Sequence, residues 1–457
     1  MRRSRLRTLA LTGTAVAMAA ALAACGGGSS DSESKGKGVT ITVEGWRPGD
    51  QKATIDYAKK QAAAFHKLHP SITIVPKEWQ WNAQTFSAQL AGGTLPISFR
   101  VPFTDTKGLV ERHQVADVDA EVRKLSYFGQ LNPNVLAAAT GADGKVYGLP
   151  SDVYANALHY NRELFTQAGL DPDKPPTTWD ELRADAKAIT DKTGVAGYGE
   201  MTKSNTGGWI LSTLTYAMGG RMESEDGKTA TLDNPASEQA LQLLHDMRWT
   251  DGSISSNNSY DWASVHQAFA SGKIAMFVSG SDVYNAMVTT DKIDPKIYGL
   301  AGIPVSDSAD AGALGGGSVN VVSAKASKAE AAAAVQWADF FRVAKYSDQD
   351  AAVADAKATA DSDQPVGTPT FSIFDEASYT TYQGWIKDYV NVPLDQMKPY
   401  TDAMFAVKLI AEPPAQTQGV YGAMDSVVQK VLTDKNADIP ALLQAANDKA
   451  QQLLDQG

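Results

Sequence analysis

The sequence predicts an α/β protein whose sheet is largely parallel and carries helices on its faces. Near the start of the folded part, Val39, Ile41 and Val43 alternate with threonines, which indicates a strand. Residues 52–68 then place apolar side chains at helical spacing, and residues 71–75 alternate again. This order of strand, helix and strand favours a parallel sheet with ligands at the carboxyl ends of its strands.

Later helices carry their own start signals. Thr178 with Glu181, and Ser327 with Glu330, have the spacing of capping boxes, and Asn234–Pro235 places a cap before a proline at the first helical position. The same α/β pattern therefore continues through the chain.

Two apolar runs indicate buried strands in the second half of the chain. They cover residues 273–278 and 318–323, and they are flanked by Gly280 and by Gly315–Gly317. The triple glycine permits two interpretations, either close approach of the backbone to a ligand or a hinge with unusual backbone angles.

Composition and charge exclude several classes of protein. The 457 residues include 43% hydrophobic and 20% charged residues, which is typical of a globular chain of two or three domains. The net charge of −11 disfavours a nucleic-acid partner. A single cysteine, Cys25, excludes an internal disulfide and a cysteine-based metal site.

The N-terminus has the three parts of a secretion signal over residues 1–24: a basic start, an uncharged apolar run and small residues before a cleavage point. The sequence Leu22-Ala23-Ala24-Cys25 resembles a bacterial lipobox, which predicts lipid attachment at Cys25 and a flexible tether over residues 25–38. An uncleaved anchor helix is the alternative, and the export route stays open. Cleavage removes four arginines and no acids, so the mature charge is 37 − 52 = −15.

Three linked motifs resemble the extracellular solute-binding protein family 1, which includes the carbohydrate-binding lipoproteins of ABC importers and the maltodextrin-binding proteins. The motifs are Gly144–Pro150, Ala157–Phe165 and Pro176–Leu182, and the segments Ala268–Met276 and Ala331–Phe341 also fit.

The resemblance implies two α/β lobes joined by three chain crossings, with a sugar bound between the lobes. The implied crossings lie near Pro150–Tyr154, Val278–Asp282 and Leu314–Ser318. The implied lobes are residues 39–149 plus 282–314 for the first, and residues 150–281 plus 315–457 for the second.

Two departures from the family pattern concern the site. The turn Gly93–Pro96 is followed by Ile97-Ser98 where relatives often carry aspartate, and Gly280 is followed by Ser281-Asp282 where they often carry an aromatic residue. The ligand is therefore expected to be held differently than in maltodextrin binders.

Aromatic residues near strand ends and loops are candidates for stacking on a sugar face. Trp46, Trp209 and Trp262 have such positions, whereas Trp179 and Trp337 are expected to pack in the core.

Carboxylates and hydroxyls near the expected crossings are candidates for binding sugar hydroxyls. Asp105 and Asp152 are the main acceptors, although a lone aspartate in a loop is often only a turn residue. The other candidates are Tyr154, Ser279, Asp282, Gly316, Ser318 and Tyr421, the last as a stacking aromatic.

These features predict a receptor of an ABC importer, anchored by lipid at the outer face of the cytoplasmic membrane, which passes a sugar to the permease. No enzyme activity, cofactor or metal is expected, because zincin, phosphate-loop and nucleophile-elbow motifs are incomplete in this sequence. A receptor for a non-sugar solute and a surface glycosidase remain the alternatives.

Overall fold

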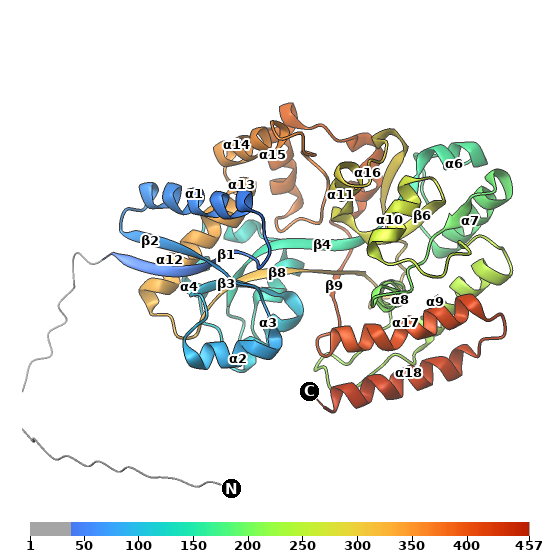
Figure 1. Cartoon of the computed structure of the whole chain (residues 1–457), viewed down its shortest axis with the longest axis horizontal. Coiled ribbons are helices and arrows are strands. Elements are labelled where there is room, and N and C mark those ends of the chain that lie inside the picture. The colour runs from blue at the N-terminus through green and yellow to red at the C-terminus, as the bar shows by residue number, and fades with distance from the viewer. Residues whose placement is uncertain (1–37, 457) are drawn as a thin grey trace, which may run out of the picture. The chain divides into compact units, whose positions relative to one another are not determined.

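The structure is a computed structural model that describes residues 38–456, and these residues form one compact unit (Figure 1). The predicted signal peptide, Cys25 and the tether up to residue 37 lie outside the described residues. The strands are β1 (Val39–Trp46), β2 (Ile72–Glu78), β3 (Ser98–Pro102), β4 (Gly148–Asn161), β5 (Ala196–Tyr198), β6 (Ile274–Gly280), β7 (Tyr298–Gly302), β8 (Ala313–Val322) and β9 (Leu409–Ala411).

Helices surround these strands throughout the described chain. They are α1 (Lys52–Leu68), α2 (Ala83–Gly92), α3 (Phe103–Glu111), α4 (Asp119–Val122), α5 (Pro133–Leu136), α6 (Arg162–Ala168), α7 (Trp179–Thr193), α8 (Thr206–Ala217), α9 (Pro235–Trp249), α10 (Trp262–Ala270), α11 (Tyr284–Thr289), α12 (Lys328–Ala338), α13 (Ala344–Ser347), α14 (Gln349–Ala360), α15 (Glu376–Ile386), α16 (Leu394–Ala403), α17 (Thr417–Thr433) and α18 (Ile439–Leu454). The site also involves two short turns, the 3₁₀ turn η3 (Ser281–Val283) and the π-helical turn η5 (Asp339–Val343).

The strands follow the order β2-β1-β3-β8-β4-β6-β5, with β7 on β4 and β9 on β8. The pairs β1–β2, β1–β3, β5–β6 and β8–β9 are parallel, as the sequence predicts. However, β4 and β8 run antiparallel to their main partners through the middle of the sheet (Figure 1). The sheet is therefore mixed, and the prediction of a largely parallel sheet is only partly correct.

The long strand β4 joins two halves of the sheet. Residues 148–155 pair with β8, and residues 156–161 pair with β6 and β7. We call β1–β3 with α1–α5 and α12 lobe 1, and β5–β7 with α6–α11 and α16–α18 lobe 2. The chain passes between the lobes in β4, again in β8, and a third time in the segment from η5 to α16.

β4 and β8 run through the expected crossings near Pro150–Tyr154 and Leu314–Ser318, whereas the strand pairing does not fit the one expected at Val278–Asp282. β6 pairs with residues 156–160 of β4, and β7 pairs with residues 157–161, so the chain between them starts and ends in lobe 2. Residues 282–314 therefore belong with lobe 2. Conversely, α12 lies within residues 315–457 but packs against β1 of lobe 1. The apolar pattern predicts helices and strands from near neighbours in the chain. It does not show which strands of the sheet those elements pack against.

The elements predicted from local signals form as expected. The helix over residues 52–68 is α1, and both capping boxes are present, at Thr178 with Glu181 and at Ser327 with Glu330. The side chain of Asn234 accepts hydrogen bonds from two amides at the start of α9. Local capping chemistry thus fixes these helix starts independently of tertiary packing.

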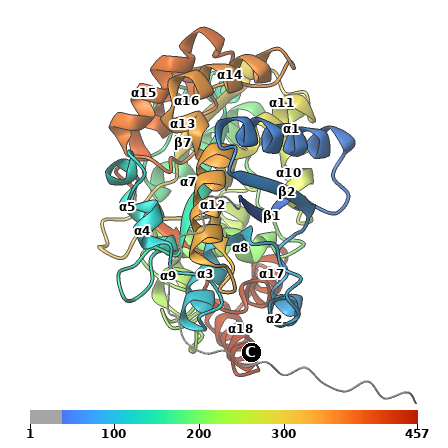
Figure 2. The same cartoon turned by 90° about the vertical axis from the view of Figure 1, so that its left-hand side faces the viewer.

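The core of lobe 1 forms where α1 and α12 cover β1 and β2 (Figure 2). Phe65 of α1 is fully buried, and its ring meets the ring of Trp337 edge to face at 5.5 Å. Trp337 is 3% exposed, which confirms its predicted place in the core. Trp179 starts α7 in lobe 2 and is partly buried against the hydrophobic core that extends through both lobes.

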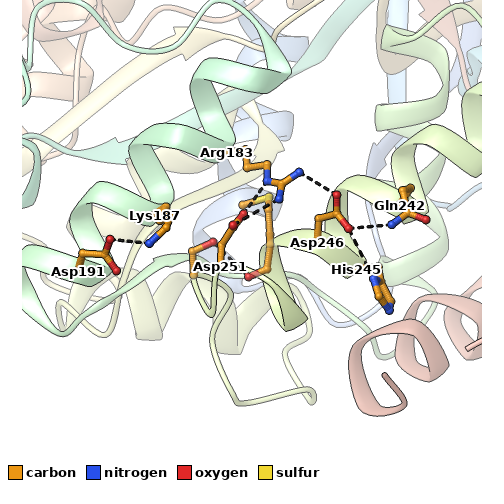
Figure 3. A network of polar contacts seen from close by, with 9 residues as sticks. Arg183, Lys187, Asp191, Gln242, His245, Asp246 and Asp251 are labelled. Atoms are coloured by element: carbon orange, nitrogen blue, oxygen red, sulfur yellow. Dashed lines mark hydrogen bonds and ion pairs between the residues drawn. The ribbon is translucent and has the colours of Figure 1, made fainter. Parts of the chain in front are cut away.

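A polar network fastens α7 to α9 in lobe 2, and Figure 3 shows it at close range. The guanidinium of Arg183 donates to Asp246 at 2.8 Å and to Asp251 at 2.5 Å. Gln242 donates to the other oxygen of Asp246 at 2.7 Å. Lobe 2 thus gains a bidentate link between two helices, which adds geometric specificity to their packing.

The triple glycine Gly315–Gly317 lies inside β8, where the backbone approaches β4 closely. A Cβ on Gly315 would lie 2.2 Å from the carbonyl oxygen of Tyr154, and one on Gly317 would lie 2.2 Å from that of Asp152. None of the three glycines has a positive φ. The glycines are therefore required by strand contact, and the interpretation as a hinge with unusual backbone angles is wrong.

Among residues 38–456, no helix is long and apolar enough to cross a membrane.

Candidate functional site

An ion-pair chain links lobe 1 to the crossing strand β4. Arg100 of β3 donates to Glu44 of β1 from its backbone amide at 2.7 Å, from Nε at 3.1 Å and from Nη2 at 2.7 Å. Its Nη1 also reaches Oδ2 of Asp152 at 3.4 Å. Burial alone would lower the pKa of Arg100, but Glu44 and Asp152 raise it above its ordinary value. Arg100 is therefore a fixed positive charge that orients Asp152.

A second polar group lies on the lobe 2 side of the same strand. The ring of Tyr154 meets that of Trp209, at the start of α8, edge to face at 6.4 Å. A Cβ on Gly316 would lie 3.0 Å from the Tyr154 hydroxyl and 3.1 Å from Oε2 of Glu412. The hydroxyl of Tyr421 donates to Oε1 of Glu412 at 3.0 Å. These contacts gather an aromatic pair and a carboxylate around Gly316. We call Tyr154, Trp209, Glu412 and Tyr421 together the Tyr154 group.

Burial controls the ionisation of this group. Burial raises the pKa of Glu412, and hydrogen bonds from Tyr421 and Tyr154 lower it in part. Burial and the nearby Glu412 raise the pKa of Tyr154 well above its ordinary value, so this phenol stays protonated. The indole Nε1 of Trp209 is buried and has no hydrogen-bond partner among the described residues. This combination leaves both donors and acceptors near Gly316.

A polar cavity of about 360 Å³ opens between β4 and the third crossing segment. Asp152 and Asp282 line it from β4 and η3, and Asn285 lines it from α11. Burial raises the pKa of Asp282, and the neighbouring Asp152 raises it further. The third crossing contributes Lys345, Tyr346, Asp355, Thr359, Thr368, Phe371, Phe374, Tyr379, Tyr382 and Gln383.

The structure thus brings five of the predicted site residues into one region. These are Asp152, Tyr154, Trp209, Asp282 and Gly316. Ser318 adjoins them in β8, where its carbonyl oxygen accepts a hydrogen bond from the Ser151 hydroxyl at 3.2 Å. Asp152 and Tyr154 could be proposed from the sequence because the family motif and the expected crossing both fall on β4, and their role in binding stays a prediction.

Tyr421 belongs to the same region but not in the expected role. Its ring is 2% exposed, so it offers no open face for stacking on a sugar. Its hydroxyl instead holds Glu412 in place. The apolar spacing of Val420 and Met424 in α17 could have indicated this burial.

Four predicted residues lie outside the contacts described above for the Tyr154 group. Trp46 ends β1, with Lys59 Nζ 5.6 Å from its ring centroid. Asp105, in the first turn of α3, accepts a hydrogen bond from Thr104. Trp262 is 43% exposed and packs on His266. Ser279 is fully buried in β6.

Sequence reasoning missed Glu44, Glu412 and Lys345 as site residues. Glu44 is 6% exposed although it ends an apolar strand, and a charged residue at that place is a signal that could have been used. Glu412 precedes a Pro-Pro turn at the end of β9. No sequence signal indicated Lys345, because the third crossing was expected at another place in the chain and not in the segment from η5 to α16.

The arrangement suits binding of a hydroxylated solute. Carboxylates of Asp152, Asp282 and Glu412 can accept hydrogen bonds from hydroxyl groups, and Tyr154 and Trp209 supply aromatic surface. Among residues 38–456, no group of three or more His, Cys, Asp or Glu side chains could hold a metal ion. The fold and the site define a two-lobed α/β binding protein with its polar residues at the strands that join the lobes.

Comparison with known proteins gives the family. Residues 49–348 match the family of bacterial extracellular solute-binding proteins, and the chain belongs to this family. Its members are substrate-binding proteins of transporters that act outside the cytoplasm.

Individual relatives match only part of this chain. A putative binding protein from Brucella abortus (strain 2308) is 30% identical over 271 residues, which span 57% of this chain and 62% of the relative. The chain therefore matches less than two thirds of that relative's length. The sn-glycerol-3-phosphate-binding periplasmic protein UgpB of Yersinia pestis bv. Antiqua (strain Antiqua) is 35% identical over 111 residues, 23% of this chain and 24% of the relative.

Solved structures show the same fold. The cyclic α-maltosyl-1,6-maltose binding protein from Arthrobacter globiformis matches with a TM-score of 0.70 and 22% identity, over 92% of this chain and all of that one. This likeness supports the two-lobed fold, and the resemblance of the sequence to maltodextrin-binding-type proteins is confirmed at the level of family and fold.

Proposed function

We propose that this protein is the receptor of an ABC importer and captures a sugar or oligosaccharide at the strands that join its lobes. The observation that carries the proposal is the position of Asp152 and Tyr154 on β4. Asp152 is paired with Arg100 of lobe 1, whereas Tyr154 packs against Trp209 of lobe 2. A solute bound here would touch both lobes.

Contact with both lobes provides a mechanism for signalling. A ligand shifts a protein between two conformations only by its differential affinity for them. A sugar that binds Arg100-linked Asp152 and the Tyr154 group together would favour closure of the lobes, which is the hinge motion known for periplasmic binding proteins. A micromolar dissociation constant corresponds to about −8 kcal/mol, which a few hydroxyl hydrogen bonds and one stacking contact can supply.

We further propose that the mature protein starts at Cys25 and is held to the outer face of the cytoplasmic membrane by lipid on this residue. The lipobox-like sequence and the polar residues that follow it support this anchor. The permease would then meet a receptor tethered close to its entrance.

The protein is proposed to have no catalytic activity of its own. A glycosidase needs two carboxyl groups placed on either side of a glycosidic bond. Incubation with oligosaccharides that bind should therefore release no new reducing ends, and steady release would establish the glycosidase alternative.

A non-sugar solute is the second candidate, and the name of the Yersinia relative favours a glycerol-based one. A thermal-shift panel of monosaccharides, oligosaccharides and polyols tests both candidates with the purified protein. We expect at least one sugar to raise Tm. A shift with polyols alone would favour the second candidate, and no shift at all would contradict both.

A further inference from the structure

Two cationic side chains stand at the start of the third crossing segment without a carboxylate partner. Arg342 lies in η5 and Lys345 in α13, three residues apart. Within residues 38–456, neither forms an ion pair. The Arg342 guanidinium lies 4.4 Å from the ring centroid of Phe341, and Lys345 Nζ lies 5.0 Å from that of Tyr346. Both cations therefore rest on aromatic faces, and the acidic groups that act on them, Glu44 and Asp152 on Arg342 and Asp355 on Lys345, form no ion pair with them.

The acidic groups nearest to Arg342 are already engaged. Glu44 accepts three hydrogen bonds from Arg100, and Asp152 accepts from Arg100 and from the Ser151 hydroxyl. Arg342 is thus a second positive charge beside two carboxylates whose hydrogen bonds already go to Arg100 and Ser151.

Both cations are partly buried, yet both stay charged at neutral pH. Burial and then the nearby Arg100 lower the pKa of Arg342 to about 10, while Glu44 and Asp152 raise it in part. Tyr346 raises the pKa of Lys345, and burial opposes this effect. A cation that is withdrawn from water without a partner is costly, so a partner supplied by a ligand would repay the cost.

The backbone and the cavity indicate where such a partner would bind. Arg342 sits in a single π-helical turn, a distortion of the helix that often occurs at functional sites. One turn further on, Lys345 lines the 360 Å³ cavity that Asp152 and Asp282 also line. Lys345 therefore shares the cavity with the carboxylates that are suited to hydroxyl groups, and Arg342 lies one helical turn earlier in the chain.

We propose that Arg342 and Lys345 form a subsite for an anionic group, and that the solute is a hydroxylated molecule bearing a carboxylate or a phosphate. The inference rests on the proposed function and specifies its substrate class. The planar guanidinium of Arg342 can bind either anion through two parallel hydrogen bonds, and Lys345 adds a compact charge. The aspartates of the same cavity would accept hydrogen bonds from the hydroxyl groups.

Isothermal titration with matched ligands tests the subsite. The sets are glucose, glucuronate and glucose 6-phosphate; galactose, galacturonate and galactose 1-phosphate; and glycerol, glycerate and glycerol 3-phosphate. In at least one set, we expect an anionic member to bind about 10-fold or more tightly than the neutral member. The tighter of the two anions then identifies carboxylate or phosphate as the group recognised.

Variants assign the effect to the two residues. Arg342→Gln and Lys345→Gln should each weaken the anionic ligand by about 10-fold while leaving the neutral member of the set unchanged. Arg123→Gln, an exposed arginine of lobe 1 paired with Asp119, is the matched control and should change neither. Tm is measured for each variant, and a large loss of stability in Arg342→Gln would indicate a structural role through Phe341, Glu44 and Asp152 instead.

The outcomes separate this inference from the proposed function. If neutral sugars bind as tightly as their anionic partners, the subsite is refuted and the sugar receptor stands. If anions are preferred but both glutamine variants keep the preference, the assignment to Arg342 and Lys345 is refuted. If no member of any set binds, the subsite is refuted, and the sugar receptor then depends on the thermal-shift panel with oligosaccharides.

Discussion

Nη1 of Arg100 lies 3.4 Å from Oδ2 of Asp152, and this contact joins strand β3 of lobe 1 to the strand that leads into lobe 2. The Asp152 side chain is half exposed, whereas that of Arg100 is 18% exposed. Asp152 therefore keeps one side open to a ligand while a buried cation fixes its position. The Asp152 carboxylate thus belongs both to the proposed solute site and to the junction between the lobes.

Asp152→Asn should weaken binding of the solute because an amide accepts hydrogen bonds less strongly than a carboxylate and also presents donors. A loss of about 10-fold or more is expected, since hydrogen bonds to charged groups contribute about 1.5–3 kcal/mol. Isothermal titration with the sugar found in the panel measures it. Asp143→Asn, in a turn of lobe 1, is the control. Equal affinities of the two variants would remove Asp152 from the site.

Gly316→Ala should also weaken binding. The added methyl would approach the Tyr154 hydroxyl and Oε2 of Glu412 within about 3 Å, so these side chains must shift from their present positions. Gly129→Ala places a methyl where no atom lies within 4 Å and should bind normally. A drop in affinity of the first variant alone, with Tm changed little, is the expected result. Unchanged affinity would mean that the Tyr154 group does not contact the solute.

Stability should fall as pH rises through neutrality because of Glu200. This carboxyl group is 2% exposed, and burial raises its pKa to about 8 from 4.5. The folded state therefore binds more protons than the unfolded state between these values, so the free energy of unfolding decreases as pH rises in that window. Between about pH 6.5 and 8.5 the loss is on the order of 2 kcal/mol.

Denaturant unfolding of Glu200→Gln measures this effect, and Glu163→Gln, on an exposed surface of α6, is the control. The Glu200→Gln variant should lose most of the pH dependence of the free energy of unfolding. It should be more stable than the wild type only at the alkaline end of this pH range. Buried His159 and His266, whose pKa values burial lowers to about 3 and 4, affect stability only at more acidic pH. An identical pH slope in wild type and Glu200→Gln would refute the assignment.

Cys25→Ser should release the protein from the membrane. Without the thiol no lipid can be attached, so the protein should move from the membrane fraction to the soluble fraction when expressed in its cell. The solute affinity of the released protein should equal that of wild type. Continued membrane retention of the variant would favour the uncleaved anchor helix.

Local chemistry explains which parts of the fold were predictable. The capping pairs at Thr178 and Ser327 and the alternation in β1 depend on near neighbours in the chain, and all formed as predicted. The lobe assignment of residues 282–314 failed because it depends on β6 and β7 both pairing with β4, which no local pattern encodes.

The residues of the candidate site also divide into those that local sequence indicates and those that only tertiary packing brings to the site. Asp152 and Tyr154 could be found because one strand carries them beside a recognisable motif. Glu412 and Lys345 could not, because β9 and the third crossing reach the site only through tertiary packing. Tyr421 was found by position but given the wrong role, since its burial depends on the packing of α17 against α8.

Lobe closure is the central claim, and a distance measurement between the lobes tests it most directly. Cys25 is the chain's only cysteine, so a Cys25→Ser background accepts spin labels at Lys67→Cys in lobe 1 and Glu163→Cys in lobe 2, both exposed positions. We expect double electron–electron resonance to show a changed and narrower distance distribution when the sugar with the largest thermal shift is added. At a sugar concentration near the wild-type Kd, the same protein carrying Asp152→Asn should show a much smaller change. A distribution that stays the same with saturating sugar would contradict the account.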